Sequence, residues 1–249
     1  MAPGRSFDPD AVEDALRGLP VIELKGLFRR SSNYTFLTEL CDPASTAPPL
    51  LAVYKPAEGE SPLWDFPAGG LYRREVAAYL VAKHLGWPRV PPTVVREEAP
   101  HGVGALQMYV VAKPERHYLA HGGEPADTWI EVALFDVLTN NADRKSGHCL
   151  TDADGDVWVI DHGLTFHVDP KLRTVIWDFA GQPVPARLRP SLERLAESLV
   201  ARDAHATRLA ELLSRRELGV LRRRLHAMLQ PGWELPHPTS AWSVPWPPV

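Results

Sequence analysis

The chain has 249 residues, of which 45% are hydrophobic and 23% charged, an ordinary composition for a globular protein. Its 27 Lys and Arg against 31 Asp and Glu give a net charge of −4, which argues against a dedicated nucleic-acid binder. No apolar run is long enough to span a membrane, and the polar first ten residues argue against a secretory signal. Only Cys41 and Cys149 are present, too few for a disulfide framework or a cysteine zinc site. We therefore expect a reduced, cytoplasmic protein, whose oligomeric state the sequence does not set.

The first half alternates short strands with two helices. Asp8 followed by Pro9 predicts a helix start, and that helix should end near Gly18. A longer helix is expected over residues 71–85, because Gly86 and Pro88 follow it. Dense or alternating apolar residues predict strands over 21–26, 35–40, 50–55, 93–96 and 105–112.

The second half is mostly helical. Thr128 and Glu131 form a capping-box pattern that predicts the start of an amphipathic helix ending near Thr139. The Asp154-Gly155 turn predicts a hairpin between residues 148 and 160. Further helices are expected over 191–199, 207–213 and 214–229, the last with a capping box.

This order of elements predicts an α+β protein with two lobes. The expected divisions are a strand-rich lobe over 1–112, a helical lobe over 113–230 and a tail over 231–249. The tail is rich in proline and tryptophan, so it cannot sustain a helix or a central strand. Whether it wraps the body through its indoles or stays disordered is left open.

Two acidic residues carry the first chemical signal. Asp143 lies in the polar stretch 141–148, and Asp161 follows the apolar strand that ends at Ile160. Because the two stretches sit at opposite ends of one hairpin arm, both carboxylates can face a common cleft. Carboxylates on loops above a rigid scaffold suit a magnesium–phosphate site, in which one binds the metal and the other accepts a proton from a hydroxyl.

A basic residue carries the second signal. Lys55 ends an apolar strand, and Glu75 lies on the helix that follows. A lysine that is buried needs a carboxylate partner, and a lysine so paired can bind phosphates as a point charge. Taken alone, these two residues are better explained by a surface lysine at the end of a strand.

Together the signals follow the protein-kinase order of lysine, glutamate, Asp-Arg and Asp-x-Gly. The Asn-x-Asp-Arg opening resembles the phosphoinositide kinases. More closely, residues 26–166 resemble an uncharacterised actinobacterial family related to phosphatidylinositol 3- and 4-kinases. The residues that carry this resemblance are Ser31-Ser32-Asn33, Tyr54-Lys55-Pro56, Arg74-Glu75, Asn141-Ala142-Asp143-Arg144 and Asp161-His162-Gly163.

The resemblance implies a kinase-like fold with ATP and Mg²⁺, or Mn²⁺, between the lobes, and phosphoryl transfer to a hydroxyl-bearing acceptor. Asp143 would be the catalytic aspartate, Arg144 would steady its loop, and Asp161 would bind the metal. Lys55 would hold phosphates and Glu75 would hold Lys55. The nucleotide would also meet the turn after the first strand, the adenine-contacting hinge and the residue before Asp161. These contacts would come from Ser31, Ser32, Asn33, Gln107, Met108, Tyr109, Val110 and Ile160.

One position departs from the kinase pattern. Five residues after the catalytic aspartate, where these kinases carry a metal-binding asparagine, the chain has His148. Imidazole suits zinc or manganese better than magnesium, so His148 either binds a metal, contacts a phosphate or marks a lost second metal site. The last reading leaves a nucleotide-binding pseudokinase open. Transfer of AMP on the same scaffold also stays open.

A metallohydrolase is the other enzyme class considered, because His148, Asp161, His162 and His167 cluster in the sequence. We rank it lower, because no His-x-x-x-His pair lies on a predicted helix and Lys55 with Glu75 would have no role. His162 is expected to pack in the turn and His167 to lie on the surface. The acceptor is not specified: a lipid head group, a sugar, another polyol or a protein hydroxyl all fit.

Overall fold

The computed structural model describes residues 8–27, 33–113, 115–121 and 126–249. By its internal contacts the chain divides into two compact units. The first unit comprises residues 1–76 and 91–109, and the second comprises residues 77–90 and 110–249.

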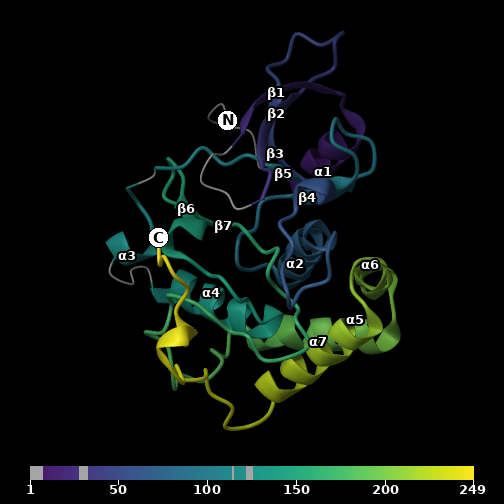
Figure 1. Cartoon of the computed structure of the whole chain (residues 1–249). Helices are drawn as coiled ribbons and strands as arrows, with labels where there is room; N and C mark the ends of the chain where they lie inside the picture. Colours follow the sequence, from purple (N-terminus) through teal and green to yellow (C-terminus); the bar gives the residue numbers. More distant parts are fainter. Residues whose placement is uncertain (1–7, 28–32, 114, 122–125) are drawn as a thin grey trace. The chain divides into compact units, whose positions relative to one another are not determined.

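The first unit is built on a five-stranded antiparallel sheet with the order β1-β2-β3-β5-β4 (Figure 1). Helix α1 (Pro9–Gly18) packs against β4 and β5. The expected strands are thus present, and α1 begins behind an Asp8 side chain that accepts from two backbone N–H groups. The strands are β1 (Val21–Leu27), β2 (Phe36–Leu40), β3 (Leu50–Pro56), β4 (Thr93–Arg96) and β5 (Gly104–Met108).

Strand β3 shows why the first unit has a core on one face. Its side chains alternate, so Ala52 and Tyr54 are buried and join Leu16 of α1 in the same apolar cluster. Lys55 has the opposite parity and lies on the other face of the strand. Arg96 of β4 then ties α1 to the sheet by donating to the carbonyls at the helix end.

Helix α2 (Leu71–Leu85) has the bounds that the sequence predicts. It ends where Gly86 adopts φ 82° and donates its N–H to the Ala82 carbonyl, a conformation that glycine reaches without strain. Its first turns belong to the first unit and its remainder to the second.

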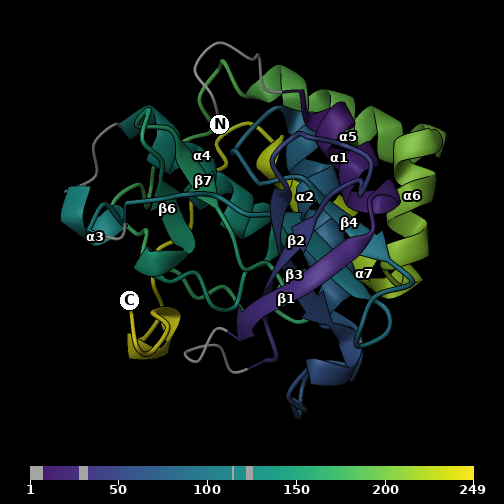
Figure 2. The same ribbon diagram turned by 90° about the horizontal axis from the view of Figure 1, so that it is seen from above.

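The second unit holds a short hairpin and a set of packed helices (Figure 2). Helix α4 is almost wholly buried, and α7 packs against both α4 and α5. The predicted capping box of α7 is formed by Ser214 and Glu217. The elements are α3 (Tyr118–His121), α4 (Ala126–Thr139), β6 (Cys149–Thr151), β7 (Val157–Val159), α5 (Arg189–Ala201), α6 (Ala204–Leu212) and α7 (Arg215–Met228), with short 3-10 turns at Ala57–Gly59, Ser146–His148 and Ala241–Ser243.

Several predicted boundaries are wrong by two or more residues, among them the start of α6 at Ala204 rather than at residue 207. The strand expected over 105–112 ends at Met108, because Ala112 and Lys113 pair with residues 151–152 of the second unit instead. Helix α4 begins at Ala126, two residues before Thr128, so Thr128 is not its N-cap. Asp127 already lies in the first turn, where a negative charge favours the helix dipole.

The tail over 231–249 runs along the second unit through main-chain hydrogen bonds rather than through the indoles of Trp242 and Trp246. The carbonyl of Ser243 accepts from the Thr174 N–H at 3.0 Å, and that of Pro248 accepts from the Ser146 N–H at 2.8 Å. Trp242 and Trp246 stay exposed, at 79% and 89%. Of the two alternatives left open by the sequence, the tail therefore follows the body but does not use these indoles to do so.

Across the described ranges, no helix combines the length and the apolar character needed to cross a bilayer.

Candidate active site

Lys55 and Glu75 form a close ion pair within the first unit. The Lys55 Nζ lies 2.5 Å from Oε1 of Glu75, and the two side chains are 20% and 3% exposed. A carboxylate partner was expected for Lys55 if it were buried, since a mostly buried ammonium must offset its lost hydration. The side chain of Lys55 is thus held at the end of β3, the geometry that a phosphate-binding lysine requires.

Gly104 allows β5 to approach the main chain of Lys55. Pro56 and Gly104 are paired in the sheet, and a Cβ on Gly104 would lie 2.4 Å from the Lys55 carbonyl oxygen. Any other residue would push the strand away there. The position of Lys55 therefore depends on a glycine that the sequence analysis did not single out.

Some main-chain and side-chain groups of the predicted adenine-contacting segment already form hydrogen bonds within the sheet. The N–H of Met108 donates to Pro92 and that of Tyr109 donates to Leu51, at 2.9 and 3.0 Å. The Gln107 side chain is buried and donates to Thr93. These two N–H groups are already used, so an adenine edge would have to meet other main-chain groups of the segment.

The turn predicted to cover the phosphates is described only in part. Ser31 and Ser32 lie outside the described residues. The Asn33 side chain accepts from the Ser61 N–H at 2.8 Å, which ties the end of this turn to the loop after β3.

In the second unit, Asp143 lies in a loop shaped by Asn141. The Asn141 side-chain oxygen accepts from the Asp143 N–H at 2.9 Å, and its amide group donates to Asp136 at 3.0 Å. This is an Asx turn, a local conformation that asparagine stabilises. The Asn-x-Asp order carried this signal, which the sequence analysis used only as part of a motif.

Lys145 is a functional candidate that the sequence analysis missed. Its Nζ lies 3.0 Å from Oδ2 of Asp143. Burial raises the pKa of the Asp143 carboxyl, Lys145 acts to lower it, and the charge of Asp161 adds to the rise. Asp143 is therefore a better proton acceptor than a solvated aspartate. The sequence did not predict this contact, because two residues that are two positions apart in an irregular loop need not face each other.

A buried network supports the Asp143 loop. Arg144 and Asp136 are both 0% exposed, and the Arg144 Nε lies 3.1 Å from each Asp136 carboxylate oxygen. Asp136 also accepts from Thr174 Oγ1 at 3.3 Å. Asp136 thus braces the loop from α4 rather than facing solvent. Because no atom of the Arg144 side chain reaches the surface, Arg144 acts on the loop and not on a substrate.

Asp161 and His148 meet at the end of the hairpin. Oδ2 of Asp161 lies 3.2 Å from Nε2 of His148, and the side chains are 48% and 15% exposed. The His148 Nδ1 accepts from the Lys145 N–H at 3.4 Å, so Nε2 carries the hydrogen that points at Asp161. The two predicted metal-site residues are therefore brought together, with the imidazole as donor.

The histidine cluster expected of a metallohydrolase does not form. No group of three or more His, Cys, Asp or Glu within the described ranges is arranged to hold a metal ion. His162 is fully buried, as predicted, and its Nε2 lies 2.7 Å from Arg144. His167, predicted to lie on the surface, is buried, and its carbonyl accepts from Asn140. The surface prediction for His167 is wrong, because this segment packs against the end of α4.

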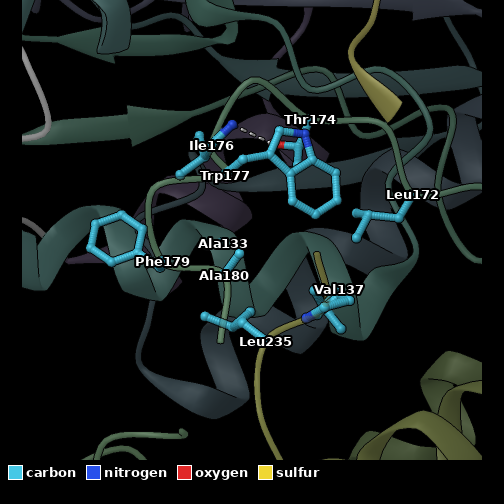
Figure 3. Close-up of a pocket in the computed structure, with 10 residues that line it drawn as sticks. Ala133, Val137, Leu172, Thr174, Ile176, Trp177, Phe179, Ala180 and Leu235 are labelled. Atoms are coloured by element: carbon cyan, nitrogen blue, oxygen red, sulfur yellow. Dashed lines mark hydrogen bonds between the residues drawn. The ribbon is translucent and has the colours of Figure 1, made fainter. Parts of the chain in front are cut away.

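A small apolar hollow lies beside this network but contains none of the candidate catalytic side chains. Ala133 and Val137 of α4, the segment 172–180 and Leu235 of the tail line it (Figure 3). Thr174, which lines it, is also the residue that donates to Asp136. The hollow is therefore where residues of the tail pack against the second unit, and it holds none of the candidate catalytic groups.

A curated protein of similar sequence identifies the family. The chain is 38% identical over 258 residues to Protein Rv2133c of Mycobacterium tuberculosis (strain ATCC 25618 / H37Rv), covering 89% of this chain and 90% of the relative. The chain belongs to the Rv2133c family. No protein-family model matches it. The predicted kinship to phosphatidylinositol kinases stays a prediction.

Solved structures identify the fold of this Rv2133c family member. A structure of hydra Fam20 with sugar matches with a TM-score of 0.53 at 16% identity, over 88% of this chain and 87% of that one. A Golgi casein kinase and the Helicobacter pylori proinflammatory kinase CtkA each match with a TM-score of 0.49, at 14% and 12% identity. They cover 89% and 86% of this chain, and 74% and 92% of their own. The Fam20 match, together with the strand-rich and helical parts described above, confirms the predicted α+β protein-kinase-like fold.

Proposed function

We propose that this protein is an ATP-dependent phosphotransferase of the kinase type that transfers the γ-phosphoryl group to a hydroxyl. The observation that carries the proposal is the set of side chains on two loops of the second unit. Asp143 with its Lys145 partner and Asp161 with its His148 partner stand on a protein-kinase-like fold. The Lys55–Glu75 pair of the first unit supports the same reading.

The roles follow from the chemistry of each group. The Asp143 carboxylate accepts the proton of the acceptor hydroxyl while that oxygen bonds to the γ-phosphorus. The bond from the γ-phosphorus to the bridging oxygen breaks, and ADP leaves. Lys55 would hold phosphate oxygens and Glu75 would orient Lys55.

The donor set fits a divalent cation that shares its ligands with phosphates. Mg²⁺ uses one or two carboxylates together with phosphate oxygens and water. The Asp161 side chain is about half exposed, so its carboxylate is accessible to such a cation. His148 offers an imidazole, which suits Mn²⁺ better. When bound, such a cation would neutralise charge on the transferred group. Asp161 would hold it, with His148 beside it.

A second candidate function is a nucleotide-binding regulator without turnover. The observation that favours it is His148 at the position of a metal-binding asparagine, where its ring donates to Asp161 instead. The lipid, sugar or protein identity of the acceptor, and AMP transfer in place of phosphoryl transfer, are left to the same experiment.

The test is ATP turnover in Mg²⁺ and in Mn²⁺ with a panel of hydroxyl acceptors, including the protein itself, and mass analysis of the products. We expect ADP and an acceptor that gains a phosphoryl group. Asp143→Ala should abolish turnover but leave nucleotide binding intact, whereas Asp161→Ala should abolish turnover and weaken metal-dependent binding. Binding without turnover in either metal would favour the regulator, and an acceptor that gains AMP would favour the adenylyl-transfer reaction. Full activity of Asp143→Ala would contradict the mechanism.

A further inference from the structure

The backbone at Asp161 adopts a conformation that needs support. Its φ is +61°, in the left-handed region that residues other than glycine seldom occupy. Such a conformation persists only where the surrounding structure fixes it. The residues that fix Asp161 therefore also fix the direction of its carboxylate.

Arg144 contacts the chain on both sides of Asp161. Its Nη1 donates to the Ile160 carbonyl at 2.7 Å, and its Nη2 lies 2.7 Å from Nε2 of His162. Both carboxylate oxygens of Asp136 accept from Nε of the same guanidinium. One rigid, fully buried group thus spans the residues before and after Asp161.

The contact with His162 defines the state of that ring. A guanidinium has only donors, so the Nε2 of His162 must accept with its lone pair. The ring is therefore neutral, with its hydrogen on Nδ1. The edge-to-face contact with Phe135, with centroids 5.5 Å apart, fixes the plane of the ring.

We propose that Arg144 and His162, with the Ile160 carbonyl, form a clamp that positions Asp161 for metal binding. This rests on the proposed function, in which Asp161 holds the cation. Neither side chain of the Asp161 clamp touches substrate, so both are positioning residues. Because Arg144 is adjacent to Asp143, the same guanidinium keeps the proton acceptor and the metal ligand in register.

The test replaces His162 and measures metal and nucleotide binding separately. His162→Phe keeps an aromatic ring but removes the acceptor, whereas His162→Gln places an amide oxygen within reach of Arg144. We measure Mn²⁺ binding by electron paramagnetic resonance with a non-hydrolysable ATP analogue, and analogue binding without metal by calorimetry. His162→Phe should raise the Mn²⁺ Kd about 10- to 100-fold and leave metal-free nucleotide binding unchanged. His162→Gln should restore most of the Mn²⁺ affinity.

A control separates positioning from general loss of stability. Leu209 is fully buried in α6 of the same unit, far along the chain from the clamp. Leu209→Ala should lower the melting temperature without changing the Mn²⁺ Kd. A folded His162→Phe variant with wild-type Mn²⁺ affinity, or with metal and metal-free nucleotide binding weakened equally, would overturn the proposal.

A measurement on the unmodified chain covers the case in which His162→Phe does not fold. Nitrogen-15 NMR of the histidines in the wild-type protein reports which ring nitrogen of His162 carries the hydrogen. A hydrogen on Nδ1 supports the clamp, and a hydrogen on Nε2 overturns it, whatever the activity. Failure of the wild-type chain to bind Mn²⁺ with nucleotide would instead overturn the proposed function, so the two failures are distinguishable.

Discussion

The imidazole of His148 donates from Nε2 to the carboxylate of Asp161 across 3.2 Å, and both residues belong to the proposed metal site. In this arrangement the ring would compete with a cation for the same oxygen. A metal bound through Nε2 would require the hydrogen to move to Nδ1, which already accepts from the Lys145 N–H. His148 should therefore govern which metal the site accepts.

We expect His148→Asn to shift the metal preference from Mn²⁺ toward Mg²⁺. An amide oxygen is a hard ligand that suits Mg²⁺, whereas imidazole is softer. The ratio of kcat/KM in Mg²⁺ to that in Mn²⁺ should rise about tenfold, which is ~1.4 kcal/mol of differential transition-state binding. The matched control is His226→Asn on α7, which should leave the ratio unchanged. An unchanged ratio for His148→Asn would show that His148 does not touch the metal.

Lys55→Met should weaken nucleotide binding about tenfold or more, because the charge that would meet the phosphates is lost. Glu75→Gln should act in the same direction but less strongly, since it leaves the ammonium without its carboxylate. Both are read as the Kd of ATP by calorimetry.

The first unit offers a matched control for Lys55. Lys25 also pairs with a glutamate of the same sheet, its Nζ lying 2.9 Å from Oε1 of Glu39, but both side chains are more exposed. Lys25→Met should leave the Kd of ATP unchanged. Equal affinities of Lys55→Met and the wild type would contradict the phosphate role of Lys55.

Lys145→Met should move the acid limb of the pH–activity profile to higher pH. The Asp143 carboxyl must be ionised to accept a proton, and its pKa is already raised by burial. Lys145 acts against that rise, so its removal raises the pKa further and a higher pH is needed to form the carboxylate. Lys145→Arg, which keeps the charge, should restore the wild-type limb. A limb that does not move in Lys145→Met would show that the ion pair does not control Asp143.

Local signals predicted much of this molecule. The Asp8 cap, the bounds of α2, the Asp154-Gly155 hairpin and the capping box of α7 each depend on a few neighbouring residues, and each is present. Glu75 was named as the partner of Lys55 through the kinase-like order of motifs, and the pair is present in the structure.

What escaped prediction depends on contacts between distant segments. The strand expected to reach residue 112 ends at Met108, because Ala112 bridges to Asp152, forty residues further along the chain. Arg144 was assigned to its loop, but its contacts with Asp136 on α4 and with His162 come from packing that no periodicity encodes. Asp143 and Asp161 could be singled out from the sequence, whereas the groups that hold them could not.

The tail offers a prediction about stability. Leu235 is buried in the apolar hollow against α4, and its N–H and carbonyl bond to Gln182 and Gly181 (Figure 3). Leu235→Ala should lower the free energy of unfolding by about 2–4 kcal/mol, since it removes buried methyl groups and leaves a cavity. The matched control is Trp246→Ala on the same tail, whose exposed indole should contribute within about 0.5 kcal/mol. Urea titration followed by circular dichroism measures both, and a loss for Leu235→Ala no larger than that for Trp246→Ala would show that the tail is not anchored there.

His205 offers a prediction about pH that does not depend on the active site. Its ring lies against that of His84, with centroids 4.3 Å apart. The pKa of His205 is lowered to about 4, mainly by burial and to a smaller extent by the nearby charge of His84. Arg208 adds to this lowering and Asp203 opposes it. The unfolded chain, in which histidine has a pKa near 6.5, therefore binds more protons than the folded chain between pH 6.5 and 4.

The stability that neutral His205 contributes should thus be fully present above pH 6.5 and should fall as the pH drops toward 4. Because the ring is only partly buried, solvent screening reduces the expected loss to about 1–2 kcal/mol. His205→Phe keeps a ring against His84 but cannot take up a proton, so its unfolding free energy should fall less steeply over the same range. Urea titrations of the two proteins at half-unit pH steps measure the difference. Parallel curves for the wild type and His205→Phe would show that His205 ionises equally in the folded and unfolded chains.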